Sequence, residues 1–121
     1  MFQGSTKNFY SYGDVTAYYS SDARLKNNIT EIDNALLKVT KIRGVTFDWN
    51  DDYMSKQPKD DYFNRKHDVG VIAQEIEKVL PEAVATRDDG IKAVRYEKLV
   101  PLLIEAIKDL KKEIDDLKKD R

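Results

Sequence analysis

Residues 100–117 read VPLLIEAIKDLKKEIDDL, and this stretch decides the fold because its apolar residues recur at alternating steps of three and four. Such spacing places them at the a and d positions of a heptad repeat, which predicts a helix over about residues 97–120 that pairs with other copies of itself. The alternative is a single amphipathic helix lying on its own domain, which fits residues 96–107 but not the end rich in Lys and Asp. The predicted seam consists of Val100, Leu103, Ile107, Leu110, Ile114 and Leu117.

Charged residues flank this seam in a pattern that suits identical parallel chains. With Ile107 at an a position, Lys111 and Lys118 take e positions. Glu113 takes a g position, so Glu113 of one chain meets Lys118 of a parallel neighbour. Isoleucine at a with leucine at d favours two strands in peptides. Pro101 lies near the start, where we expect the helix either to kink or to begin.

The residues before this helix predict a small α+β core that the long helix covers. In chain order, we expect a helix over about 31–41 closed by Gly44, a strand over 45–50, a buried strand over 69–73, a helix over 74–80 and a hairpin of 83–86 with 91–94. Thr30 is expected to cap the first helix, whose apolar face is Ile32, Ala35, Leu36, Leu37 and Val39. Trp49 is expected in the core, and residues 50–66 in a long exposed loop. Leu102 and Ile104 lie off the seam and should pack on the chain's own sheet.

Composition narrows the class of protein. A chain of 121 residues with 21 basic and 22 acidic residues forms one domain at most and lacks the positive charge that drives nucleic-acid binding. It has no Cys, which excludes disulfides and Cys metal sites, and no apolar run long enough to span a membrane. No His or carboxylate cluster has metal-ligand spacing, so we expect no cofactor. Asp51–Asp52 and Asp60–Asp61 more plausibly solvate a loop than bind calcium.

A second informative stretch, SSDARLKNNI at residues 20–29, lies where a Tyr-rich leader gives way to the charged domain. Ser21 is followed by Lys26, and a hydroxyl with an amine is the smallest set of groups that hydrolyses a peptide bond without His or Cys. Taken alone, the spacing is more typical of a polar turn that caps a helix than of a catalytic pair.

The wider pattern is more specific than this pair. The string Ser-Asp-x-Arg-Leu-Lys-x-x-Ile at 21–29 is followed by HDVGVIAQE at 67–75 and Leu-Pro-Glu at 80–82. Together they resemble the self-cleaving intramolecular chaperone domain at the C-terminus of phage tail spikes, tail fibres and neck appendages. The resemblance extends from Ser21 to about Leu117.

The resemblance implies that residues 21–121 assemble a homotrimer, overriding the two-strand peptide rule, and then cut the Ser20–Ser21 bond. It assigns Ser21 as nucleophile and Lys26 as general base, and it makes Asp22, Arg24, His67 and Glu75 candidates for supporting the site. The expected partners are other copies and the upstream fibre or appendage polypeptide, within a virion tail precursor assembled in the host cytoplasm. The leader, residues 1–20, would be the end of that polypeptide or an aromatic surface strand. Its aromatic residues are Phe2, Phe9, Tyr10, Tyr12, Tyr18 and Tyr19.

The proposed chemistry sets two structural conditions. Five extended residues span roughly 16 Å, so the chain must fold back between Ser21 and Lys26 or borrow a neighbour's lysine. A lysine also works as a base at neutral pH only where its surroundings disfavour its charge. Assembly would provide such surroundings, so we expect cleavage to depend on trimerisation. Two alternatives remain: a non-cleaving trimerisation cap, and the equivalent self-cleaving domain of a membrane-bound transcription factor.

Overall fold

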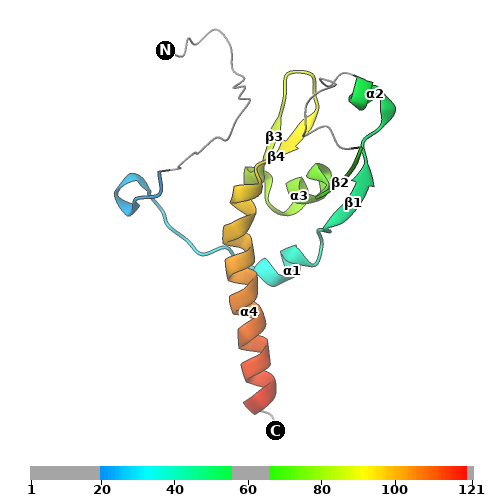
Figure 1. Ribbon diagram of the computed structural model, residues 1–121. Helices are drawn as coiled ribbons and strands as arrows, with labels where there is room; N and C mark the ends of the chain where they lie inside the picture. The colour runs from blue at the N-terminus through cyan, green and yellow to red at the C-terminus, as the bar shows by residue number, and fades with distance from the viewer. Residues whose placement is uncertain (1–19, 56–65, 120–121) are drawn as a thin grey trace. The chain divides into compact units, whose positions relative to one another are not determined.

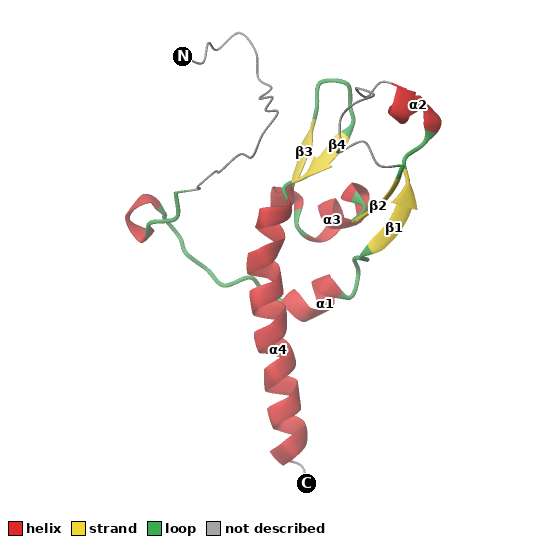
Figure 2. Ribbon diagram, viewed as in Figure 1, coloured by secondary structure: helices red, strands yellow, loops and turns green. Residues whose placement is uncertain are grey.

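Two units make up the chain in the computed structural model, Met1–Thr30 and Glu31–Arg121, and residues 20–55 and 66–119 are described. The described part of the second unit is α+β, with two two-stranded antiparallel sheets, short helices and the 21-residue helix α4, Leu99–Lys119 (Figures 1 and 2). The predicted fold class is therefore confirmed for the single chain. The aromatic residues of the predicted leader lie outside the described residues.

Helix α4 follows a 3-10 turn, Tyr96–Lys98, and carries Pro101 in its first turn. Proline is tolerated there because the first N–H groups of a helix have no intrahelical partner. Leu102 is fully buried, as predicted, and Ala106 is 5% exposed. The prediction for Ile104 was wrong, since its side chain is 51% exposed. Two residues along a helix rotate a side chain by about 200°, so Ile104 points away from the core that buries Leu102.

Helix α1, Ala35–Val39, packs against α4 and is shorter than the predicted helix over 31–41. Asn34 has a φ of 52°, in the left-handed region, so the helix begins only after it. Thr30 is not the cap, because its hydroxyl donates to the carbonyl of Asn28 at 3.3 Å. Leu37 is 56% exposed, which corrects its predicted place on the buried face, whereas Ala35 is fully buried.

Strands β1, Val45–Asp48, and β2, His67–Gly70, form the first sheet, with Val45 opposite Gly70 and Asp48 opposite His67. The predicted alternation in β1 is confirmed, because Val45 and Phe47 are half-buried between exposed neighbours. The predicted buried strand over 69–73 was wrong in position and burial: β2 ends at Gly70, and Val69 is 69% exposed. A two-stranded sheet backed by the core on one face leaves alternate side chains of its other face in water.

Trp49 lies at the border of the core rather than inside it. Its indole is half-buried, packs edge-on against Phe47 with ring centroids 4.9 Å apart, and donates from Nε1 to Asp68 at 3.2 Å. On its other side it stacks on Tyr53 at 4.5 Å. The indole N–H needs a polar partner, which favours this border position.

The segment predicted as an irregular loop over 50–66 contains helix α2, Asp51–Ser55. Asn50 caps this helix, because its Oδ1 accepts a hydrogen bond from the Tyr53 N–H at 2.8 Å. Two aspartates in the first turn also interact favourably with the helix dipole. Asp60–Asp61 lies outside the described residues.

The remaining elements agree with prediction. Helix α3, Ala73–Val79, ends before the 3-10 turn Pro81–Ala83. Strands β3, Val84–Thr86, and β4, Lys92–Val94, form the expected hairpin, whose turn places Gly90 at a φ of 87°. The small core lies between α3, α1 and α4. Its buried members are Ala35, Ile76, Leu80, Ala83, Leu102 and Ala106.

Candidate active site

The hydroxyl of Ser21 and the amine of Lys26 meet in the first unit, with Oγ and Nζ 2.7 Å apart. A 3-10 turn, Ala23–Leu25, folds the chain back between them. Its hydrogen bonds are short, with Leu25 N donating to the Asp22 carbonyl at 3.0 Å and Lys26 N to the Ala23 carbonyl at 3.1 Å. Of the two routes expected from the sequence, the single chain shows the first: it folds back and brings Lys26 to its own Ser21.

Asp22 and Arg24 hold this turn together. The Asp22 carboxylate accepts the Arg24 backbone N–H at 2.9 Å, which caps the turn. The same carboxylate accepts the guanidinium through Nε at 3.0 Å and Nη2 at 2.8 Å. These bonds from Arg24 hold the pKa of Asp22 below its ordinary value. The contacts of both residues are with each other, and their support of the site stays a prediction.

All described residues of the first unit are exposed to solvent. Ser21 and Lys26 thus have the geometry for proton transfer. They lack the dry surroundings that favour an uncharged lysine, able to accept a proton, at neutral pH. Leu25 and Ile29 are 71% and 72% exposed, although the motif is otherwise polar. The sequence analysis did not single out these two side chains as candidates for a contact with a partner. The signal was available, since an aliphatic side chain in a polar turn has no local partner to pack on.

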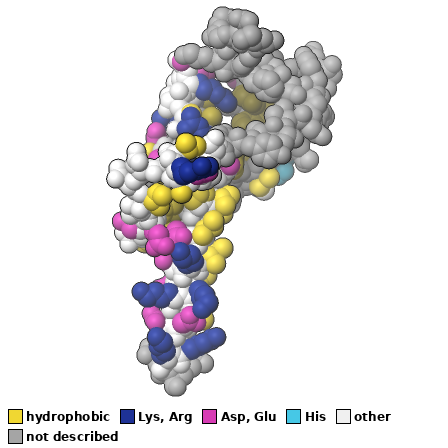
Figure 3. Space-filling model, turned by 90° about the vertical axis from the view of Figure 1, so that its left-hand side faces the viewer, with side chains coloured by type: hydrophobic (Ala, Val, Ile, Leu, Met, Phe, Trp, Pro, Cys, Tyr) yellow, Lys and Arg dark blue, Asp and Glu magenta, His cyan; other side chains and the backbone are white. Residues whose placement is uncertain are grey.

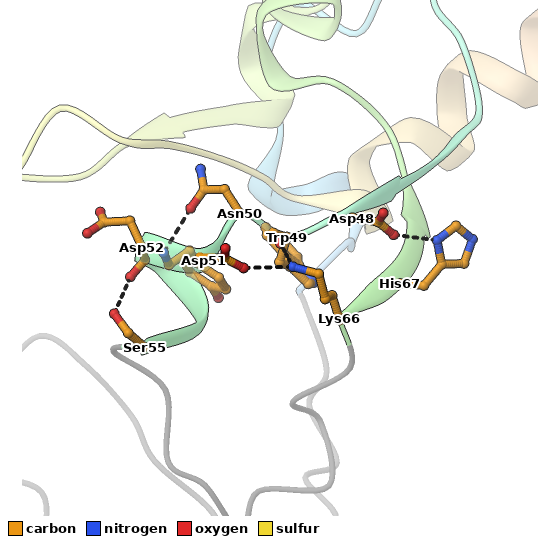
Figure 4. Close-up of polar contacts among 9 residues, drawn as sticks. Asp48, Trp49, Asn50, Asp51, Asp52, Ser55, Lys66 and His67 are labelled. Carbon is orange, nitrogen blue, oxygen red and sulfur yellow. Dashed lines mark hydrogen bonds and ion pairs between the residues drawn. The ribbon is translucent and has the colours of Figure 1, made fainter.

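His67 and Glu75 both have partners within the second unit. His67 Nδ1 lies 2.6 Å from Asp48 Oδ1, next to the ion pair of Lys66 with Asp51 at 2.9 Å (Figure 4). Asp48 and His67 are opposite each other in the β1–β2 ladder, which explains their contact.

Arg43 binds Glu75 through Nη2 at 2.6 Å and Nε at 3.0 Å, and these bonds lower the pKa of Glu75. The Glu75 side chain is 24% exposed. Arg43 was not anticipated from sequence, because 32 residues separate it from Glu75 and no local pattern joins them. A role for Glu75 or His67 in cleavage stays a prediction.

The predicted seam is a stripe of exposed apolar side chains along α4. All six residues are between 44% and 67% exposed in the single chain. Hydrophobic side chains gather along one edge of the upper part of α4 in Figure 3, while charged side chains surround its lower end. Large apolar side chains are costly to leave in water, so this face is suited to a protein partner.

Across residues 20–55 and 66–119, no group of three or more His, Asp or Glu side chains is placed to hold a metal ion. Within the same ranges, no helix is both long and apolar enough to cross a membrane.

Comparison with known proteins agrees with the motif. Residues 21–85 match a peptidase family described as "Chaperone of endosialidase". The chain is similar to the "Long tail fiber protein Gp37" of Enterobacteria phage K3, with 34% identity over 124 residues, and to that of Enterobacteria phage Ox2, with 39% identity over 117 residues. These alignments cover 97% and 91% of this chain but only 9% and 44% of the relatives. "Myelin gene regulatory factor-like A" of Dictyostelium discoideum is 28% identical over 118 residues, covering 88% of this chain and 13% of that protein.

Proposed function

The chain belongs to the chaperone-of-endosialidase peptidase family, and from this premise we propose that it is the self-cleaving C-terminal chaperone of a phage tail fibre or appendage protein. Residues 21–121 would form the chaperone domain, and residues 1–20 the end of the upstream polypeptide. Similarity to Gp37 tail fibre proteins supports a place in a virion tail precursor, assembled in the host cytoplasm. No cofactor, nucleic acid or membrane enters this proposal.

The contact between Ser21 Oγ and Lys26 Nζ is the observation that carries the catalytic part. Ser21 Oγ attacks the carbonyl carbon of Ser20 while Lys26 takes the hydroxyl proton and passes it to the Ser21 nitrogen. The Ser20–Ser21 C–N bond breaks, and an ester joins the Ser20 carbonyl to Ser21 Oγ. Water then hydrolyses the ester, leaving a carboxylate on Ser20 and a free hydroxyl and amine on Ser21. Each chain reacts once and has no substrate other than itself.

The exposed stripe of α4 supports the assembly part of the proposal. Three parallel copies would bury the a and d side chains against one another in a coiled coil. The peptide rule for isoleucine at a and leucine at d points to two strands, and we follow the family resemblance in proposing three. The upstream fibre polypeptide would be brought into the same three-fold arrangement through its covalent link to residue 21.

Assembly would promote cleavage by excluding water from the Ser21–Lys26 turn. The Ser21–Lys26 turn is exposed in the single chain, and its flanking Leu25 and Ile29 have unburied side chains. Packing within a trimer would remove water from the turn and disfavour a charged lysine. Cleavage would then release only fibres whose chains have already assembled.

The test is mass spectrometry of freshly expressed protein. The wild-type chain should yield a fragment that begins at Ser21. The Ser21→Ala chain should remain whole, and it should fold and assemble as before because the substitution removes only one hydroxyl group. Ser20→Ala is the matched control and should still be cut. Cleavage that persists in Ser21→Ala, or a new N-terminus elsewhere, overturns the assignment.

A second candidate is the equivalent domain of a membrane-bound transcription factor, favoured by the similarity to the Dictyostelium discoideum protein. Its identity of 28% is lower than the 34% and 39% found for the tail fibre proteins. A third reading, a trimerisation cap with an inert Ser21, predicts a single intact species of wild-type protein in the same experiment.

A further inference from the structure

A groove of about 510 Å³ runs between α1 and the C-terminal half of α4. Leu36 and Leu37 of α1 form part of one wall, and Asp109, Glu113 and Asp116 of α4 form part of the other. The groove is built firmly, because the Asp109 carboxylate accepts the Leu36 backbone N–H at 3.2 Å and so fastens the start of α1 to α4.

The groove combines apolar surface with a net negative charge, since its α4 wall carries Lys112 beside the carboxylates of Asp109, Glu113 and Asp116. Leu37 is 56% exposed, and it is one of the large apolar side chains that the core does not use. Glu113 and Asp116 form no ion pair within residues 20–55 and 66–119. A long basic side chain fits such a surface, since it can lay its carbon stem on a leucine and place its ammonium near the carboxylates.

We propose that this groove receives Lys118 of a second copy of the chain, so that α1 forms the outer wall of the oligomer interface. The inference rests on the proposed parallel coiled coil. In that arrangement a g residue faces the e residue of the next heptad on the neighbouring helix, which pairs Glu113 with Lys118. The α4 wall of the groove spans heptad positions c, f and g, and Glu113 at g is the residue of that wall beside the seam, where an e residue of the neighbouring helix reaches it. The charge of the occupant and of the groove are therefore complementary.

The preceding heptad supplies a natural contrast. Lys111 also occupies an e position, but the g position it would face is Ala106, which carries no charge and is 5% exposed. Lys111 is already paired with Asp115 of its own helix at 2.7 Å. Of these two e-position lysines, Lys118 is the one with an acidic g partner, and it forms no ion pair within residues 20–55 and 66–119.

Charge reversal tests the inference in the full-length chain with Ser21→Ala, which keeps it whole. Lys118→Glu should weaken self-association at least tenfold, measured by sedimentation equilibrium over a dilution series, because each trimer exchanges three attractions for three repulsions. Adding Glu113→Lys should recover most of that loss. Lys111→Glu, the matched control with the same change of charge, should stay within about threefold of the parent.

A second variant tests the apolar wall. Leu37→Ser should weaken association by about threefold to tenfold while far-UV circular dichroism of the chain stays unchanged, since Leu37 is largely exposed in the single chain. If the parent protein, the full-length chain with Ser21→Ala alone, is monomeric at all concentrations, the coiled coil and the groove are both refuted. A parent that associates, with Lys118→Glu no weaker than Lys111→Glu or with Leu37→Ser unchanged, refutes the groove alone and leaves the coiled coil standing.

Discussion

The Ser21–Lys26 turn and the seam face of helix α4 are both exposed to solvent, but the turn exposes polar side chains and the helix exposes apolar ones. In the turn, the polar side chains of Ser21, Asp22, Arg24 and Lys26 have partners within five residues. In α4, the six apolar seam residues are 44% to 67% exposed. The turn is complete in its hydrogen bonds but lacks dry surroundings, whereas the helix has an apolar face that lacks a cover.

This difference assigns the two conditions for cleavage to two regions. The short distance between Ser21 Oγ and Lys26 Nζ, the proposed nucleophile and base, is built within five residues of one chain. The exposed turn cannot itself remove water from the lysine, and in the proposed function assembly through the uncovered face of α4 does so. Variants in each region should therefore fail in different ways.

The largest effect is expected from placing charge in the seam. Ile107→Asp with Leu110→Asp should convert the proposed trimer to monomers, because three chains would each bury unpaired charges at its axis. Light scattering measures the mass of the particle in solution and so reports whether the protein is monomeric. Mass spectrometry over days should find the chain uncut, although Ser21 and Lys26 are intact.

The control for that variant places an aspartate at the outward f position of the last heptad, Lys119→Asp. It changes the net charge by the same amount but should leave both association and cleavage in place. Efficient cutting by a verified Ile107/Leu110 monomer would show that the turn needs no assembly, and the two regions would then be independent.

An intermediate effect is expected from loosening the turn. Asp22→Ala removes both the cap and the ion pair with Arg24 and should slow cleavage roughly fivefold, whereas Asp22→Asn keeps a capping side chain and should slow it less. Time courses by mass spectrometry measure both rates, and sedimentation should report unchanged association. Equal slowing by the two variants would mean that the charge, not the cap, holds the turn.

A smaller effect is expected where the 3-10 turn before α4 meets the first sheet. A Cβ added at Gly70 would lie 2.6 Å from the Tyr96 hydroxyl, which accepts the Val71 N–H at 3.2 Å. Gly70→Ala should therefore push Tyr96 outward and lower the free energy of unfolding by about 1 kcal/mol, measured in urea at fixed protein concentration. In a Tyr96→Phe background the same change should cost less, and an equal cost would place the strain elsewhere.

The smallest effect concerns pH. Arg24 holds the pKa of Asp22 below its ordinary value of 3.8. The Asp22 carboxylate therefore takes up a proton less readily in the folded turn than in an unfolded chain. The stabilisation is present above the ordinary pKa and is lost as pH falls through the lowered one. NMR titration should find a lower midpoint for Asp22 in the parent than in Arg24→Ala. Equal midpoints would show that the ion pair is not populated in solution.

Local patterns predicted most of the elements. The alternation in β1, the Asp-Gly turn of the hairpin, the stop of α3 at Pro81 and the long helix all depend on neighbours in sequence. The motif likewise identified Ser21 and Lys26, whose contact the turn then supplied. The helix α2 was missed despite a local signal, because the cap at Asn50 was read as part of a polar loop.

By itself, the sequence determined the family motif, the heptad stripe and the short-range hydrogen bonds of the turn, because each depends on residues a few positions apart. Tertiary structure decided where α1 begins, since Asp109 from α4 binds its first turn, and that Arg43 binds Glu75 across 32 residues. It also decided that Leu102 is buried while Ile104 is exposed. Both are apolar and off the seam, and only the position of the core beside α4 distinguishes them.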